Sequence, residues 1–227
     1  MSNLFGRLYL IPSRLFLVEQ QNHLRERMPE TARLTQAVLT NNEENVQLRL
    51  ATIADIPALE KLIRESVRGL SAEHYTPEQI TSGLTYVFGV DTQLIIDGTY
   101  FVVEVEEQLV GSGGWSKRKT LFGGDQSKGA EDPLLDPSRE AARIRAFYVD
   151  PRWSRRGIGT QILRACETAA RQAGFSRIEL AATMPGVPLY NARGYEKAEA
   201  IEIETPDGKS LPVIRMTKNL RIDSQSQ

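Results

Sequence analysis

The sequence is poor in cysteine and carries almost no excess charge. Cys166 is the one cysteine among 227 residues, which excludes an internal disulfide and a metal site built from several cysteines. It belongs to an apolar helical face, where a small packed hydrophobic residue is expected. Lysine and arginine together number 28 and the acidic residues 29, so no overall field attracts nucleic acid or an anionic membrane. We therefore expect no metal, no nucleic-acid partner and no membrane partner.

Long hydrophobic runs are also missing. The apolar residues near the start of the chain are interrupted by Arg7, Pro12 and Arg14. This pattern is too broken for a transmembrane helix, and it lacks the apolar stretch and cleavage site of a signal peptide. Together with the single cysteine, it favours a cytoplasmic location.

The first 45 residues differ in character from the rest. They become polar after residue 18, so we expect 1–45 to be a poorly ordered extension with a short helix around 30–39. A helix that binds a partner is the alternative. The folded domain is then expected to span 46–220, followed by a tail at 221–227.

Short apolar runs alternate with helical patterns through the domain, and no internal repeat is present. Strands are expected at 46–51, 100–105, 109–115, 143–150, 177–182, 197–204 and 211–220. Helices are expected to begin near residues 56, 78, 158 and 186, the first with Asp55 as its N-cap. Residues 117–140 form a long, charged, irregular connection. Hairpins dominate this order, so the class is mixed α+β, or α/β in looser usage.

One stretch combines a buried strand, a basic loop and an amphipathic helix. The strand ends at Asp150-Pro151, and the loop that follows contains two arginines and two glycines: Arg155, Arg156, Gly157 and Gly159. The first turn of the helix leaves backbone N–H groups without partners, and the helix dipole adds positive charge there. A phosphate or pyrophosphate is the expected guest. The alternative is that the glycines serve only a tight turn.

Two common nucleotide-binding motifs do not fit this loop. A Rossmann fingerprint needs a third glycine where Ile162 stands, and a P-loop needs a lysine between Gly159 and Thr160. The stretches Val149-Asp150-Pro151 and Arg156-Gly157-Ile158-Gly159-Thr160 instead resemble the central motif of the GNAT superfamily of acyl-CoA N-acyltransferases. Ser154 departs from that motif, which usually has Gln or Arg there, and Arg155 is adjacent.

A second stretch, 182–195, resembles another motif of the same family. Three residues match in place, namely Leu189, Tyr190 and Gly194, while Thr183, Gly186 and Tyr195 replace the usual Asn, Ala and Phe. The resemblance covers about 46–220. It implies a GNAT-type mixed, largely antiparallel sheet flanked by helices. In that fold the strands 143–150 and 177–182 splay apart, and the pantetheine of the cofactor lies in the gap.

The resemblance also implies an N-acetyltransferase that transfers an acetyl group from acetyl-CoA to a primary amine of a small molecule or peptide. Its partners would be acetyl-CoA and the amine acceptor, and a homodimer is left open. The residues that would bind acetyl-CoA are Tyr148, Val149, Arg155, Arg156, Gly157, Ile158, Gly159, Thr160 and Thr183. Backbone N–H groups at the Val149 strand end would polarise the thioester. Tyr190 matches the family tyrosine that protonates the departing thiolate, and a merely packed aromatic residue is the alternative.

The general base is not assigned. In some relatives a glutamate early in the strand 143–150 serves, and here Arg143 occupies that position. The remaining candidates are Glu104, Asp136, Glu140, Glu179 and His74, each of which could equally be a surface charge, and water could accept the proton. A non-catalytic acyl-CoA-binding or regulatory module therefore stays as the alternative function. The acidic residues of 117–140 favour, weakly, a cationic acceptor.

Overall fold

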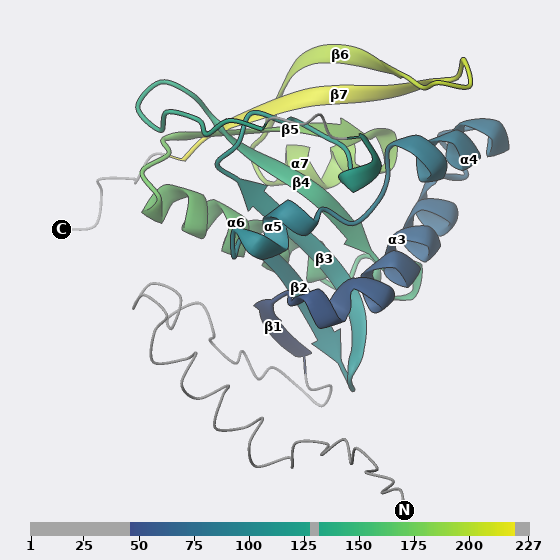
Figure 1. Ribbon diagram of the computed structural model, residues 1–227, viewed down its shortest axis with the longest axis horizontal. Helices are drawn as coiled ribbons and strands as arrows, with labels where there is room; N and C mark the ends of the chain where they lie inside the picture. The colour runs from purple at the N-terminus through teal and green to yellow at the C-terminus, as the bar shows by residue number, and fades with distance from the viewer. Residues whose placement is uncertain (1–45, 128–131, 221–227) are drawn as a thin grey trace, which may run out of the picture. The chain divides into compact units, whose positions relative to one another are not determined.

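The computed structural model describes residues 46–127 and 132–220. The expected extension at 1–45, its short helix and the tail at 221–227 lie outside the described residues. Within the described part, seven strands form one sheet in the order β1-β2-β3-β4-β5-β7-β6 (Figure 1). These strands are β1 (Val46–Leu50), β2 (Tyr100–Val105), β3 (Gln108–Ser116), β4 (Ala142–Val149), β5 (Arg177–Thr183), β6 (Glu196–Glu204) and β7 (Ser210–Asn219).

The described part of the chain also contains helices and short 3₁₀ turns. The helices are α3 (Ile56–Ser71), α4 (Pro77–Tyr86), α5 (Thr92–Ile96), α6 (Ile158–Gln172) and α7 (Val187–Ala192). The turns are η1 (Ile53–Asp55), η2 (Asp125–Ser127), η3 (Pro151–Trp153) and η4 (Met184–Gly186). All the expected strands are present, with ends within about one residue of the prediction. The mixed α+β class is confirmed.

Two helix predictions need correction. Helix α5 was not predicted, because its five residues TQLII resemble a short buried strand; the side chain of Asp91 caps it by accepting from Leu94 N–H at 3.3 Å. Asp55 does not act as a side-chain N-cap of α3. Its carboxylate instead accepts from the N–H of Thr52 at 2.7 Å, which places the start of the helical segment one turn earlier, at η1.

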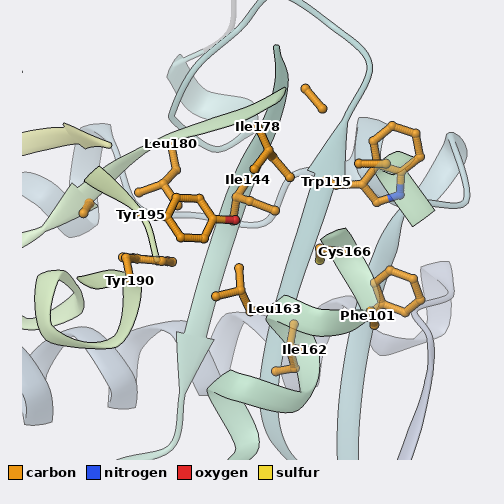
Figure 2. Packing of buried hydrophobic residues seen from close by; sticks show 14 of the residues in the cluster. Phe101, Trp115, Ile144, Ile162, Leu163, Cys166, Ile178, Leu180, Tyr190 and Tyr195 are labelled. Atoms are coloured by element: carbon orange, nitrogen blue, oxygen red, sulfur yellow. The ribbon is translucent and has the colours of Figure 1, made fainter. Parts of the chain in front are cut away.

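The two faces of the sheet carry separate hydrophobic cores. Side chains alternate along β2, so Phe101, Val103 and Val105 share one core with α6, while Tyr100 and Val102 share the other with α3. Figure 2 shows the first core, in which Ile162, Leu163 and Cys166 of α6 lie against the sheet. The predicted buried role of Cys166 is confirmed, since its side chain is fully enclosed.

Strands β4 and β5 form the parallel pair of the sheet, and they separate almost at once. They are joined at Ala142↔Ile178 and Arg143↔Glu179 and at no further residue. Strand β5 then continues against β7 through Thr183, and β4 continues against β3 through Val149. The two strands therefore diverge toward their carboxyl ends, which confirms the expected splayed pair and leaves room between them.

Candidate active site

A cavity of about 630 Å³ opens where β4 and β5 diverge. One part of its wall comes from β4, the loop before α6, and the η4–α7 segment. Another part comes from α3, residues 87–88, residues 121–123 and the β6–β7 hairpin. Most residues predicted to bind acetyl-CoA line this cavity: Tyr148, Val149, Arg155, Gly157, Gly159, Thr160 and Thr183. Arg156 and Ile158 do not.

The loop before α6 has the backbone shape that an anion site needs. Arg155 and Gly157 both adopt positive φ angles, +64° and +88°, which turn the chain sharply into the helix. Gly157 is the N-cap of α6 and has no side chain to cap the first turn. The N–H groups at this end of a 15-residue helix are therefore left to another acceptor. These features fit a pyrophosphate group.

The two loop arginines differ in position. The exposed side chain of Arg155 lines the cavity, as does that of Ser154 before it. The guanidinium of Arg156 lies over the ring of Trp153, 4.7 Å from the ring centroid, in a cation–π contact. Arg156 therefore supports Trp153, which itself lines the cavity, and does not face the cavity. Ile158 is buried, and its side chain packs against Gly111 of β3.

Gly159 lies against side chains of α7 and β4, a packing role that the sequence analysis did not predict. A Cβ atom at this position would lie 3.0 Å from Leu189 Cδ2 and 3.5 Å from Phe147 Cε1. The missing side chain thus lets α6 approach both α7 and β4. A bulky residue here would disturb this packing as well as any bound phosphate, so its effect would not report on phosphate binding alone.

A bulge bends β4 beside the cavity. Tyr148 pairs with Ser112 and Arg145 with Gly114, so Ala146 and Phe147 together oppose one residue of β3. Ala146 takes a φ of +50°, which a residue with a Cβ seldom adopts. Bulges of this kind re-aim side chains next to active sites. Here Ala146, Phe147 and Tyr148 all line the cavity.

The end of β4 makes a contact with α3 that no local sequence pattern predicts. The backbone N–H of Val149 donates to Ser66 Oγ of α3 at 3.2 Å. Ser66 is buried and also lines the cavity.

Tyr75 is a second residue that the sequence analysis did not identify. Its hydroxyl accepts from Met184 N–H at 3.0 Å and donates to Pro212 O at 2.7 Å. Tyr75 thereby connects the α3–α4 turn to η4 and to β7.

Tyr190 lies on α7, where it is buried and lines the cavity. The ring packs edge-on against Phe147 and Tyr195, with centroids 6.0 and 5.6 Å apart. Figure 2 shows Tyr190 beside Tyr195. Gly186 allows this position, because a Cβ there would lie 3.2 Å from the Tyr190 ring. Burial raises the pKa of Tyr190, so its hydroxyl stays protonated near neutral pH. No group in the described part of the chain hydrogen-bonds this hydroxyl, which is free to donate to a ligand.

Most candidates for the general base are engaged elsewhere. Glu179 pairs with Arg143 and, at 2.7 Å, with Arg215, and it is buried outside the cavity. Glu104 pairs with Arg49 at 2.8 Å. Asp136 accepts from Ser138, and Glu140 accepts from the Asp136 N–H. His74 alone of the five lines the cavity, where it is exposed at the end of α3.

The described residues contain neither a membrane-spanning helix nor a group of metal ligands. No helix there is long and apolar enough to cross a membrane. No group of three or more His, Cys, Asp and Glu side chains in 46–127 and 132–220 could hold a metal ion.

Residues 65–195 match the family model described as the Acetyltransferase (GNAT) family. This match covers more than half of the chain and spans both motifs. The chain belongs to the GNAT acetyltransferase family. The resemblance inferred from the sequence is confirmed, and the protein is an acyl-CoA N-acetyltransferase of this family. No curated protein matches the chain.

Solved structures show the same GNAT fold. A GCN5-related N-acetyltransferase from Rhodopseudomonas palustris has a TM-score of 0.57 at 19% identity, covering 79% of this chain and 99% of its own. The PaiA N-acetyltransferase from Thermoplasma acidophilum, in complex with coenzyme A, has a TM-score of 0.53 at 15% identity and covers 77% and 98%. YncA from Salmonella typhimurium, with its cofactor acetyl-CoA, has a TM-score of 0.53 at 15% identity and covers 80% and 98%.

Proposed function

We propose that this GNAT protein transfers the acetyl group of acetyl-CoA to a primary amine of a small molecule or peptide. One observation carries the proposal: the uncapped start of α6 and Tyr190 line the same cavity between β4 and β5. The two similar structures that contain coenzyme A or acetyl-CoA support the choice of cofactor. We also propose that 46–220 is the catalytic domain and that the protein works in the cytoplasm.

The residues around the cavity divide the work of binding. The N–H groups of the first turn of α6, together with Arg155, would hold the pyrophosphate. The open edges of β4 and β5 would bond the amides of pantetheine, with Thr183 at the end of β5. Tyr148 would contribute mainly through the β4 backbone, because its side chain packs toward the α3 core.

Acetyl-CoA supplies the acetyl group as a thioester. The amine nitrogen forms a bond to the acetyl carbon, and the bond from that carbon to sulfur breaks. Tyr190 donates its phenolic proton to the departing sulfur, which prevents the thiolate from attacking the product. The nitrogen loses one proton to solvent or to a nearby base, and Tyr190 regains one from solvent. Protons and charges therefore balance over the cycle.

His74 is the residue that we propose to accept the proton from the amine. It is the one candidate base among the described residues that lines the cavity, on the side formed by α3 and the α3–α4 connection. Histidine is the side chain that ordinarily exchanges a proton near neutral pH. Arg143, which stands at the position of the glutamate found in some relatives, cannot serve, because it is protonated and paired with Glu179.

The test is release of free thiol from acetyl-CoA in the presence of a panel of primary amines, with mass spectrometry of the products. Acetylated amine formed in proportion to thiol, and lost in the variant Tyr190→Phe, is the expected result. Binding of coenzyme A without any amine-dependent thiol release would contradict the proposal and favour a purely acyl-CoA-binding role.

A further inference from the structure

We infer that the acceptor is a primary amine carried on an apolar body, and not a polyamine or a basic peptide. This inference rests on the proposed acetyl transfer and concerns the part of the cavity beyond the β4–β5 gap. That part is enclosed by α3, residues 87–88, residues 121–123 and the β6–β7 hairpin.

Hydrophobic side chains dominate this acceptor region. Those that line it from separate elements include Val67, Leu70, Phe88, Phe122, Ile203 and Val213. Val213 belongs to a small core with Tyr75, Val87, Ile203 and Leu211, so the apolar lining of the region continues into packed residues. Apolar surface of this kind gains free energy by covering an apolar ligand and gains nothing from a highly charged one.

No carboxylate among the described residues lines the cavity, so the described structure gives no support to the expectation of a cationic acceptor. The acidic side chains that the structure describes in the connection 117–140 make contacts within the protein. Asp125 accepts from Thr92 N–H at 3.0 Å, and Asp132 accepts from Thr120 N–H at 2.9 Å. Asp136 accepts from Ser138. These loop residues stabilise the loop itself and offer no charge to an ammonium group.

The ionisable groups other than tyrosine that do line the cavity are basic side chains. They are His74, Arg145, Arg155 and Arg193. Arg145 has a fully enclosed side chain and pairs with Asp91 at 2.8 Å, so its charge is balanced within the protein. Burying several ammonium groups beside such a lining would leave them without counter-ions, which is costly. A single amine that reacts as the neutral base avoids this cost.

The experiment compares 2-phenylethylamine with spermidine as acceptors for the full-length protein. We expect kcat/KM from thiol release to be at least about 100-fold higher for the aromatic amine. A second readout, independent of turnover, is saturable binding of each amine to the complex with coenzyme A, followed by calorimetry. Phenylethylamine should bind and spermidine should not.

A matched pair of charge variants sharpens the test. Phe122 is 36% exposed at the rim of the cavity, so Phe122→Asp adds a carboxylate there without opening the core. Leu134 is 59% exposed in the same connection and does not line the cavity, so Leu134→Asp is the control. Phe122→Asp should lower kcat/KM and affinity for phenylethylamine by about tenfold or more and improve both for spermidine. Leu134→Asp should change neither.

The outcomes separate this inference from the proposed function. Preferred turnover or binding of spermidine by the unmodified protein would overturn the apolar acceptor while leaving acetyl transfer intact. Binding of phenylethylamine that responds to Phe122→Asp, without thiol release from any amine, would uphold the apolar site and refute acetyl transfer. Failure of phenylethylamine to bind would overturn the inference directly.

Discussion

The backbone N–H of Val149 and the hydroxyl of Ser66 are hydrogen-bonded at 3.2 Å. The sequence places Val149 at the strand end that meets the cofactor, whereas the structure gives its N–H an acceptor from α3. A serine hydroxyl rotates freely, so Ser66 satisfies this buried donor until a carbonyl oxygen of a ligand replaces it. With the cofactor bound at the end of β4 as proposed, Ser66 would compete with it for the same backbone group.

Removing that competitor should tighten cofactor binding. One hydrogen bond of this kind is worth about 0.5–1.5 kcal/mol, so Ser66→Ala should lower the Kd for coenzyme A by about two- to tenfold. Calorimetry with coenzyme A measures this. Ser71→Ala is the control, because Ser71 also lines the cavity from α3 but makes no contact with Val149 in the described structure. Weaker binding by Ser66→Ala alone would mean that its hydroxyl contacts the ligand.

The two loop arginines should contribute unequally to affinity. Arg155 lines the cavity and can make charge-assisted bonds to phosphate, each worth about 1.5–3 kcal/mol, so Arg155→Ala should weaken binding of coenzyme A about 10- to 100-fold. Arg156 lies over Trp153, so Arg156→Ala should cost less than about threefold. Titration of both variants checks this. Equal losses would restore the prediction from the sequence that both arginines bind phosphate.

Tyr190→Phe should lower kcat with little change in the KM for acetyl-CoA. The change removes only the hydroxyl and keeps the edge-on packing against Phe147 and Tyr195. General acid catalysis is worth about 10²–10⁴ in rate, and the loss should fall in that range. Tyr195→Phe is the matched control, since that hydroxyl is buried in the same cluster but does not line the cavity. A kcat within a few-fold of the unmodified enzyme for Tyr190→Phe would assign the proton to water.

His74→Gln should lower kcat/KM for the amine and flatten its rise with pH. Glutamine keeps hydrogen-bonding capacity and cannot take up the proton. The neighbouring variant Glu73→Gln should leave the pH profile unchanged, because Glu73 is exposed and does not line the cavity. Profiles of kcat/KM against pH distinguish the two. An unaltered profile in His74→Gln would leave solvent as the acceptor.

Glu179→Gln should destabilise the fold. It removes the carboxylate that balances Arg143 and Arg215, and loss of one partner of a buried pair costs about 3–5 kcal/mol. The lower part of that range is expected, because the Arg215 side chain is 40% exposed. Glu199→Gln, which alters an exposed partner of Arg215, should cost about 0–1 kcal/mol. Urea denaturation measures both, and equal values would show that the cluster adds little.

The order of strands and helices follows from local pattern, and so it could be predicted. Alternation of apolar and polar residues along β1, the Pro77 start of α4 and the glycine stop after α6 are all local signals. Helix α5 was missed, because a segment of five residues, TQLII, is too short to show a helical period and the deciding interaction is the cap from Asp91. Local sequence could not settle that choice.

The site residues could be predicted from the sequence only where they belong to one of the two family motifs. The glycine loop and Tyr190 lie together at one cavity, as the two motifs implied. Ser66 and Tyr75 act through contacts with residues 83 and 109 positions away, and no short-range pattern marks them. The different orientations of Arg155 and Arg156 depend on a positive φ and on the ring of Trp153, neither of which can be read from the residue types alone.

Because β4 and β5 pair at only two positions, the sheet consists of two parts, β1–β4 and β5–β7–β6, which are joined at one end of these strands. Glu179 of β5 forms ion pairs with Arg143 of β4 and with Arg215 of β7, so it links the two parts of the sheet where they meet. The charge cluster of Arg143, Glu179 and Arg215 therefore lies where the two parts of the sheet meet, outside the cavity. Substitutions at this cluster should alter the fit of the cofactor without touching it.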